Sequence, residues 1–179
     1  MMLGWHWIAE DRRLRYGARD VVEIGKTYTA TGPLHLCANG MHASRRALDA
    51  LQYAPGPIVC RVRLSGELLH DTDKSVARSR AVLWMADATS VLHEFALTCA
   101  EDALGFMAAR GEVVDPRSRA ALDCKRRWLR GQASDEELDA AWAAAGAAAG
   151  AAARDAAWDA ARAAQNLALE TMLTALGPR

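Results

Sequence analysis

The segment Cys37-Ala38-Asn39-Gly40-Met41-His42-Ala43-Ser44 constrains the fold more than any other part of this sequence. It follows the short apolar run Leu34–Leu36 and precedes an amphipathic helix expected over residues 45–54. Asn-Gly bends a chain readily, and junctions between a strand and a helix carry binding groups more often than the interiors of these elements. We therefore expect a functional site here, although the residue types do not name a reaction.

The short apolar runs of residues 1–70 are separated by Gly and Pro, a pattern typical of strands joined by turns. The expected strands are Gly4–Ile8, Leu14–Tyr16, Val21–Ile24, Tyr28–Thr31 and Ile58–Leu64. Ser44 is placed to cap the helix that begins at Arg45, because its hydroxyl can accept from a first-turn amide. We predict an α+β fold in which residues 1–80 form a β-rich domain with a small, mainly antiparallel sheet.

Helices are expected in the rest of the chain. From Ala81, apolar residues recur at three- and four-residue steps, which predicts a long amphipathic helix that ends near Gly111. Asp115-Pro116 then offers a cap and a favourable first residue for a second helix. Residues 81–131 are therefore expected to be amphipathic helices that pack on the β-rich domain.

The last segment, residues 132–179, is rich in alanine, the residue with the highest helix propensity. It opens with Ser134-Asp135-Glu136-Glu137, a capping box in which the Ser and Glu side chains bond to each other's backbone amides. An unbroken helix here would be about 65 Å long at 1.5 Å per residue. We expect either a long helix or a helical hairpin broken near Gly146 and Gly150. Because alanine lets helices approach closely, we favour packing or self-association into a homo-oligomer over a dedicated effector arm.

The charge balance argues against nucleic acids and membranes as partners. The chain has 22 basic and 22 acidic residues and a formal net charge of zero, so it lacks a broad basic surface. Arg154, Asp155, Asp159 and Arg162 interrupt the alanine-rich stretch, and the N-terminal residues lack the basic start and apolar core of a signal peptide. The four cysteines form no CxxC pair, which favours a cytoplasmic protein with reduced thiols.

Few residues have the spacing of a catalytic set. His42 and Ser44 would face the same side of a strand, but a serine nucleophile also needs an orienting carboxylate and oxyanion donors. Glu94 in the expected long helix is a candidate catalytic carboxylate if it is buried, and we favour a position at the solvent-exposed edge of that helix. The Cys and His spacings do not match structural zinc sites, so no metal site is predicted. No P-loop and no GxGxxG motif is present.

Residues 22–67 resemble a small uncharacterised domain found in many phage and actinobacterial proteins. The matching pattern is Gly25-Lys26-Thr27-Tyr28, Cys37-x-x-Gly40-x-His42-Ala43, Leu48-Asp49-Ala50-Leu51-x-Tyr53 and Ser65-Gly66-Glu67. The alanine-rich tail is similar to the tails of predicted phage and immunity-type proteins. The resemblance carries no activity that transfers to this chain.

The same segment is similar, more remotely, to the ADP-ribosyltransferase-like fold. The residues that carry this likeness are Gly40-Met41-His42-Ala43-Ser44, Ala50-Leu51-Gln52-Tyr53 and His6, with His42 in the place of the family's Tyr. This resemblance implies an enzyme in which His6 and His42 position NAD and a carboxylate, Glu94 or Glu67, assists.

The leading hypothesis is a phage-type accessory protein that binds a host protein or protein complex as a defence, immunity or anti-defence component. Its binding residues would be Asn39, Ser44 and Tyr53, and it would need no cofactor. The alternative is an ADP-ribosyltransferase-like enzyme with His6, His42 and Glu94 as catalytic residues and NAD as cofactor. A third hypothesis is an immunity protein that neutralises a toxin.

Overall fold

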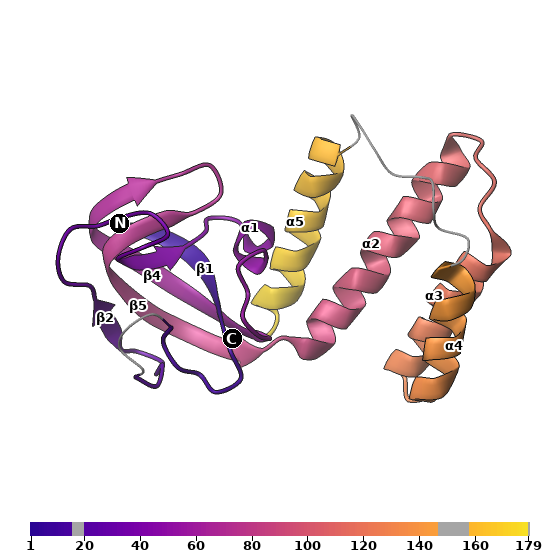
Figure 1. The fold of residues 1–179 in the computed structure, drawn as a ribbon, viewed down its shortest axis with the longest axis horizontal. Helices are drawn as coiled ribbons and strands as arrows, with labels where there is room; N and C mark the ends of the chain where they lie inside the picture. Colours follow the sequence, from indigo (N-terminus) through magenta and orange to yellow (C-terminus); the bar gives the residue numbers. More distant parts are fainter. Residues whose placement is uncertain (16–19, 147–157, 179) are drawn as a thin grey trace. The chain divides into compact units, whose positions relative to one another are not determined.

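A computed structural model describes residues 1–15, 20–146 and 158–178 (Figure 1). One five-stranded antiparallel sheet is followed by helices, which confirms the predicted α+β fold. The strands are β1 (Met2–Ile8), β2 (Thr27–Thr29), β3 (Met41–Ala43), β4 (Ile58–His70) and β5 (Ser75–Asp87). The helices are α1 (Ala47–Leu51), α2 (Thr89–Ala109), α3 (Pro116–Leu129), α4 (Asp135–Gly146) and α5 (Trp158–Thr174).

The chain divides into two compact units. The sheet unit contains residues 1–89 and 163–179, and the helical unit contains residues 90–162. Most of α5 therefore belongs with the sheet, whereas α4 belongs to the helical unit. The domain boundaries expected near residues 80 and 131 stay predictions. Residues 147–157, which include the predicted break at Gly150, lie outside the described residues, so the choice between one tail helix and a hairpin also stays a prediction.

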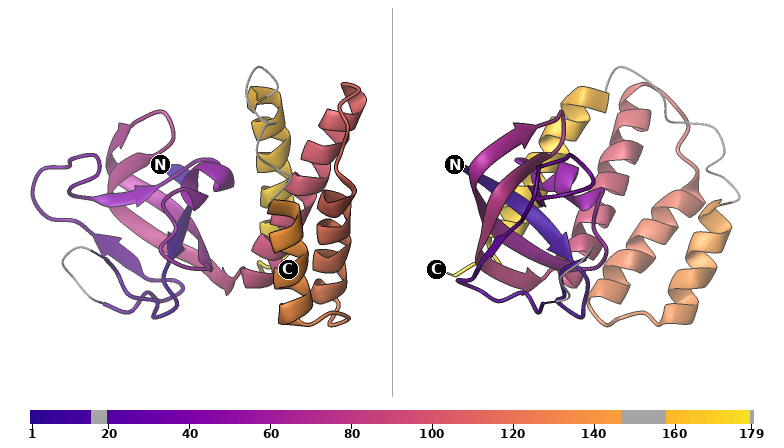
Figure 2. Two further views of the ribbon diagram at one scale, coloured as in Figure 1. Left: turned by 45° about the vertical axis from the view of Figure 1, so that its right-hand side comes forward. Right: turned by 60° about the vertical axis from the view of Figure 1, so that its left-hand side comes forward.

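The sheet is built around the long hairpin of β4 and β5. Its strand order is β1-β4-β5-β2, and β3 also pairs with β5. The β4–β5 register shifts between Arg61 and Val62 and again between Ser65 and Leu68. Such irregularities bend strands and increase their twist, and the sheet is visibly curled (Figure 2).

One face of the sheet, called here the core face, carries the main apolar cluster. Residues directly opposite each other on paired strands share a face, as do alternate residues along one strand. Because burial of a large apolar side chain contributes about 1.5–3 kcal/mol, this cluster is the main source of stability for the sheet. Its members include Met2, Ile8, Tyr28, Ile58, Cys60, Val62, Leu64, Ala77 and Val82.

The opposite face of the sheet carries Trp5 and Trp84, whose rings meet edge to face with centroids 5.8 Å apart. The Arg61 guanidinium lies 4.5 Å from the centroid of the Trp5 ring. The end of the chain also reaches this face, because a Cβ added to Gly177 would lie 3.1 Å from the Trp84 ring. The C-terminal segment is therefore part of the sheet unit's packing.

Residues 75–87 form strand β5, so the prediction of a helix from Ala81 was wrong, and α2 begins at Thr89. The apolar residues from Ala81 to Ala86 are nearly consecutive, which suits a buried strand as well as a helix. Antiparallel pairing with β4 gives the backbone N–H and C=O groups of these residues their hydrogen bonds, which favours the strand over the helix. In the described part of residues 14–24, the expected strands are replaced by an isolated bridge between Arg13 and Val21.

Ser44 does not cap α1, which corrects the prediction. Only 2% of Ser44 is exposed, and its backbone pairs with Trp5 through bonds of 2.8 and 3.0 Å. Helix α1 begins at Ala47, and the N-cap residue Arg46 makes no side-chain capping bond. Ser44 instead extends the pairing of β3 alongside β1.

The amides at the start of α1 bond to side chains of α5. Glu170 Oε1 accepts from the Ala47 N–H at 3.0 Å, and Asn166 Oδ1 accepts from the Leu48 N–H at 3.0 Å. These bonds do the work of a local cap, which typically contributes about 1 kcal/mol. They also join the C-terminal helix to the segment that follows the Cys37–Ser44 turn.

The start signals of α3 and α4 are confirmed. Asp115 Oδ1 accepts from the Arg117 N–H at 2.8 Å and thereby caps α3. In the capping box of α4, the Ser134 N–H donates to Glu137 Oε2 at 2.8 Å, and the Glu137 N–H donates to Ser134 Oγ at 3.2 Å. In both caps the side chain bonds to an amide only two or three residues away, so the cap can be recognised from the local sequence.

Candidate functional site

Asn39, a predicted binding residue, holds together the turn that precedes β3. Its Nδ2 donates to the carbonyl oxygens of Thr31 at 2.8 Å and Pro33 at 2.7 Å. The backbone of Asn39 also forms an isolated bridge with His35. Both amide hydrogens of the side chain are therefore used inside the loop.

Both ring nitrogens of His42 also contact backbone groups of this turn. Its Nε2 accepts from the Cys37 N–H at 3.0 Å, and its Nδ1 lies 3.1 Å from the Gly40 carbonyl oxygen. This pair of contacts fits a neutral ring with its proton on Nδ1. Burial lowers the pKa of His42, which favours the same neutral form.

Tyr53 lies near the same turn, with 52% of its surface exposed. Its hydroxyl donates to Asp73 Oδ2 at 2.6 Å and accepts from Lys74 Nζ at 3.1 Å. Hydrogen bonds to the Cys37 and Tyr53 side chains raise the pKa of Lys74. Lys74 therefore links Tyr53 to the turn that contains Asn39 in an exposed polar cluster.

His6 lies on the core face of the sheet. It is opposite Cys60 in the β1–β4 ladder, and it is half-buried. Burial holds the pKa of His6 well below its usual value, and the charges of Arg80 and His42 lower it further. His6 is therefore neutral near pH 7.

Arg80 is a buried cation on the same face. It is opposite Leu64 of β4 and Tyr28 of β2, and only 3% of it is exposed. Its Nη1 donates to the His42 carbonyl oxygen at 2.8 Å, but its Nε is buried without a hydrogen-bond partner. Burial lowers the pKa of Arg80 to about 10, which leaves the guanidinium charged near pH 7. Sequence reasoning missed this residue, because an arginine in a strand gives no signal of burial.

The structure brings His6 and His42 within electrostatic reach of each other. Glu94 is exposed on α2 in the helical unit, which confirms the favoured position at the helix edge. The grouping of the three as a catalytic set stays a prediction. Within the described ranges, no cluster of three His, Cys, Asp or Glu side chains is arranged to hold a metal ion.

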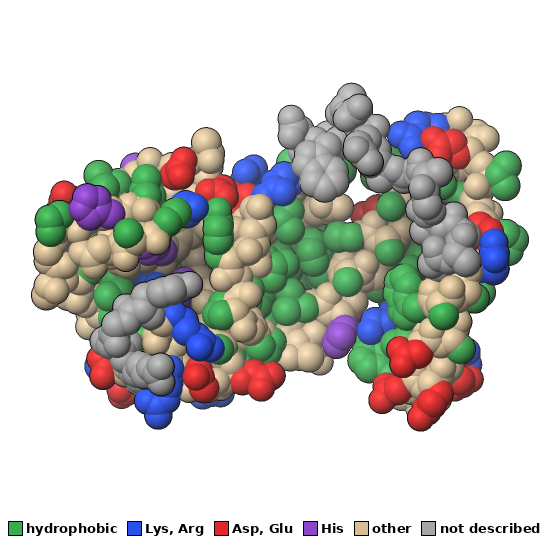
Figure 3. Space-filling model, in the orientation of Figure 1, with side chains coloured by type: hydrophobic (Ala, Val, Ile, Leu, Met, Phe, Trp, Pro, Cys, Tyr) green, Lys and Arg blue, Asp and Glu red, His purple; other side chains and the backbone are tan. Residues whose placement is uncertain are grey.

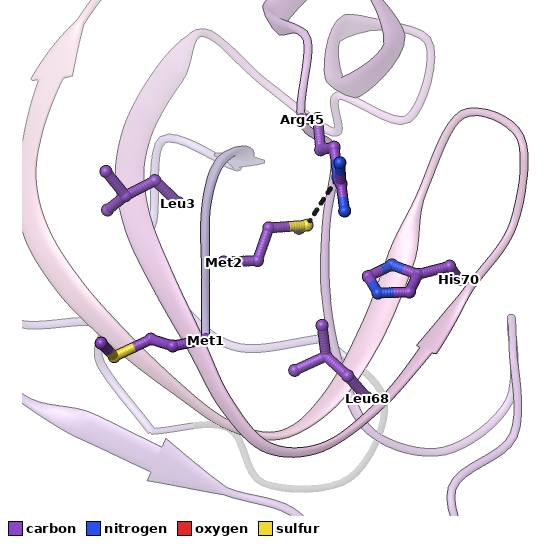
Figure 4. Close-up of a pocket in the computed structure, with 6 residues that line it drawn as sticks. All are labelled: Met1, Met2, Leu3, Arg45, Leu68 and His70. Carbon is purple, nitrogen blue, oxygen red and sulfur yellow. Dashed lines mark hydrogen bonds between the residues drawn. The ribbon is translucent and has the colours of Figure 1, made fainter.

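An open pocket of about 530 Å³ lies at the start of β1 (Figure 4). The Nε of Arg45 donates to Met2 Sδ at 3.4 Å across this pocket. None of the site residues expected from the sequence lines it. The lining residues are Met1, Met2, Leu3, Arg45, Leu68 and His70.

Acidification is expected to destabilise the protein through His6. The pKa of His6 in the folded protein is below the unfolded value of 6.5. Below pH 6.5, His6 therefore binds a proton in the unfolded chain before it does so in the folded protein. Stability is complete above pH 6.5 and falls below it, by up to about 1.4 kcal/mol per pH unit for one such group. Urea unfolding at pH 7.5 and 5.5 should therefore show a smaller loss for His6→Gln than for the unsubstituted chain.

Burial also lowers the pKa values of His42 and His93, so these residues also reduce the stability of the fold at acidic pH. His6→Gln should therefore remove only part of the stability that is lost on acidification. His35→Gln, which changes an exposed histidine of the same unit, is the control substitution. An identical loss in His6→Gln and the unsubstituted chain would contradict the assignment of His6 as neutral in the folded protein.

No helix among the described residues is long and apolar enough to cross a membrane.

Comparison with known proteins gives one match. No curated protein and no solved structure matches the chain. Residues 7–94 match the model of a family described as a domain of unknown function, DUF7666. The matched range spans β2 to β5, α1, most of the predicted site residues and the start of α2. The sheet-forming part of this chain is thus similar to an uncharacterised domain family, DUF7666.

Proposed function

We propose that this protein acts by binding a partner protein in the cytoplasm, as a phage-type accessory protein that engages a host protein or protein complex. The observation that supports this most strongly is the exposure of α2 in the helical unit. Of its 21 residues, only Phe95 is buried. A defence, immunity or anti-defence role would follow from the identity of the partner.

Helix α2 has more apolar side chains than it buries. Phe106 is 52% exposed, and several further apolar residues are only half-buried. Apolar side chains are visible along this helix in Figure 3. Contiguous exposed apolar surface on a protein commonly marks an interaction site. The half-buried apolar residues include Val91, Leu92, Leu97, Leu104 and Met107.

Ion pairs occur beside this apolar surface, as at the polar rim of a protein interface. Arg110, one helical turn after Phe106, pairs with Glu112 at 2.7 Å. On another part of α2, Glu101 pairs with Arg126 of α3. The proposed partner is therefore a protein with an apolar contact surface, and rim charges would set its orientation.

The ADP-ribosyltransferase-like alternative requires His42 to contact NAD. Both ring nitrogens of His42 have hydrogen-bond partners inside the turn, which favours binding over catalysis. The alternative predicts that labelled NAD and a host lysate would yield a labelled protein when this chain is added. The immunity-protein hypothesis differs only in the partner, which would be a toxin.

A photoreactive residue at position 106 tests the proposal. We expect it to crosslink to a partner in host extract, whereas the same residue at position 24 should not. Ile24 is a matched control, because it is 59% exposed but lies in the sheet unit.

A further inference from the structure

The geometry points to an oxyanion-binding site on the core face of the sheet, where Arg80 and His6 hold a phosphate or carboxylate group. This site is independent of the proposed protein-binding surface, because it lies in the sheet unit and α2 lies almost wholly in the helical unit. It needs no chemical step, only a ligand whose oxygen atoms accept hydrogen bonds.

The first argument is that the Nε of the buried Arg80 guanidinium lacks a hydrogen-bond partner. A buried charge costs several kcal/mol unless it is paired and hydrogen bonded. Arg80 is 3% exposed and makes one side-chain hydrogen bond, to the carbonyl oxygen of His42, while its buried Nε has none. A site of this kind is completed by an acceptor that carries negative charge.

The second argument is that, among the described residues, no protein carboxylate bonds to Arg80. Among the described residues, the groups that interact electrostatically with Arg80 are the Cys60 thiol, the Tyr28 hydroxyl and the two histidines. Burial raises the pKa of Cys60 to about 11, so the thiol stays neutral. The Tyr28 hydroxyl is already bonded to the backbone of the preceding loop, at 2.9 and 2.8 Å.

The third argument is the position of His6. In the part of the chain that the structure describes, its ring makes no hydrogen bond, although it is only half-buried. His6 therefore offers an imidazole N–H within electrostatic reach of the Arg80 guanidinium, whose buried Nε–H has no hydrogen-bond partner.

These donors define the class of ligand. A guanidinium forms its strongest hydrogen bonds with carboxylate and phosphate oxygens, at separations of about 2.7–2.9 Å. A neutral imidazole adds one donor and becomes a second cation when an anion stabilises its proton. The ligand is thus a small oxyanion or the oxyanionic end of a larger molecule.

The test is NMR titration of the five histidine rings of the full chain in chloride, inorganic phosphate or acetate at equal ionic strength. We expect the His6 titration midpoint to rise by about one pH unit when the anion binds, because a nearby opposite charge shifts a pKa by 1–3 units. The rings of His35, His70 and His93 serve as internal references, whereas His42, whose carbonyl oxygen accepts from Arg80, does not. A response to phosphate alone or to acetate alone identifies the ligand group, and a response to both indicates a general oxyanion site.

No change at His6, or an equal change at all five histidines, would overturn the proposal. Arg80→Gln should abolish the response, while Arg78→Gln should keep it, because Arg78 lies on the same strand but already pairs with Glu67 at 2.8 Å. If Arg80→Gln fails to fold, His6→Gln provides the second variant. It should weaken phosphate or acetate binding by about tenfold in calorimetry, the cost of one good hydrogen bond to a charged group, and unchanged affinity would contradict a role for His6.

Discussion

Replacing Gly40 with alanine is expected to lower the free energy of unfolding by about 3 kcal/mol or more, because a strained backbone and overpacking each cost about 1–3 kcal/mol. Gly40 has a φ of +127°, which L-residues rarely adopt. An added Cβ would lie 2.3 Å from Val76 Cγ2 and 3.0 Å from Leu34 Cδ2. The close approach of the turn to β5 therefore leaves no room for a side chain at this position.

Gly25→Ala is the matched control for this prediction. Gly25 also has a positive φ, of +83°, but nothing lies within 4 Å of an added Cβ. Only the backbone strain of about 1–2 kcal/mol should then appear. Urea unfolding followed by tryptophan fluorescence measures both losses, and equal losses would show that the contact with Val76 carries no cost.

Replacing Leu173 with alanine is expected to lower the free energy of unfolding by about 2–5 kcal/mol, the usual cost of a cavity in a packed core. Leu173 is fully buried in α5, as is Leu169 one turn earlier. The same helix supplies the carboxylate and amide oxygens that accept from the first amides of α1. Loosening α5 would therefore also weaken the start of α1.

Leu167→Ala provides the comparison within the same helix, because Leu167 is 68% exposed. It should change the free energy of unfolding by less than about 0.5 kcal/mol. If Leu173→Ala were as mild as Leu167→Ala in urea unfolding, the assignment of α5 to the packed sheet unit would be wrong.

Local sequence signals predicted local structure well. Asp115-Pro116 and the Ser134–Glu137 box start helices as expected, because each cap bonds to amides only two or three residues away. The same reasoning failed at Ser44. The amides that it was expected to cap instead bond to Asn166 and Glu170, over one hundred residues later.

The candidate site was predictable only in part. The Cys37–Ser44 segment was found from its residue types, and the structure explains them as the parts of a tight turn. Arg80 was missed because an arginine in a strand gives no signal of burial. Strand pairing alone places Arg80 on the same face as His6, and a pairing register cannot be read from one strand's own sequence.

Site-specific photo-crosslinking from α2 is the most direct test of the claim that this protein acts through a partner protein. Benzoylphenylalanine replaces Phe106 in one variant and Ile24 in the other, and each is illuminated in host extract. The account predicts a discrete protein adduct from position 106 that is missing from position 24. The absence of an adduct at position 106, or the same adducts from both positions, would contradict it.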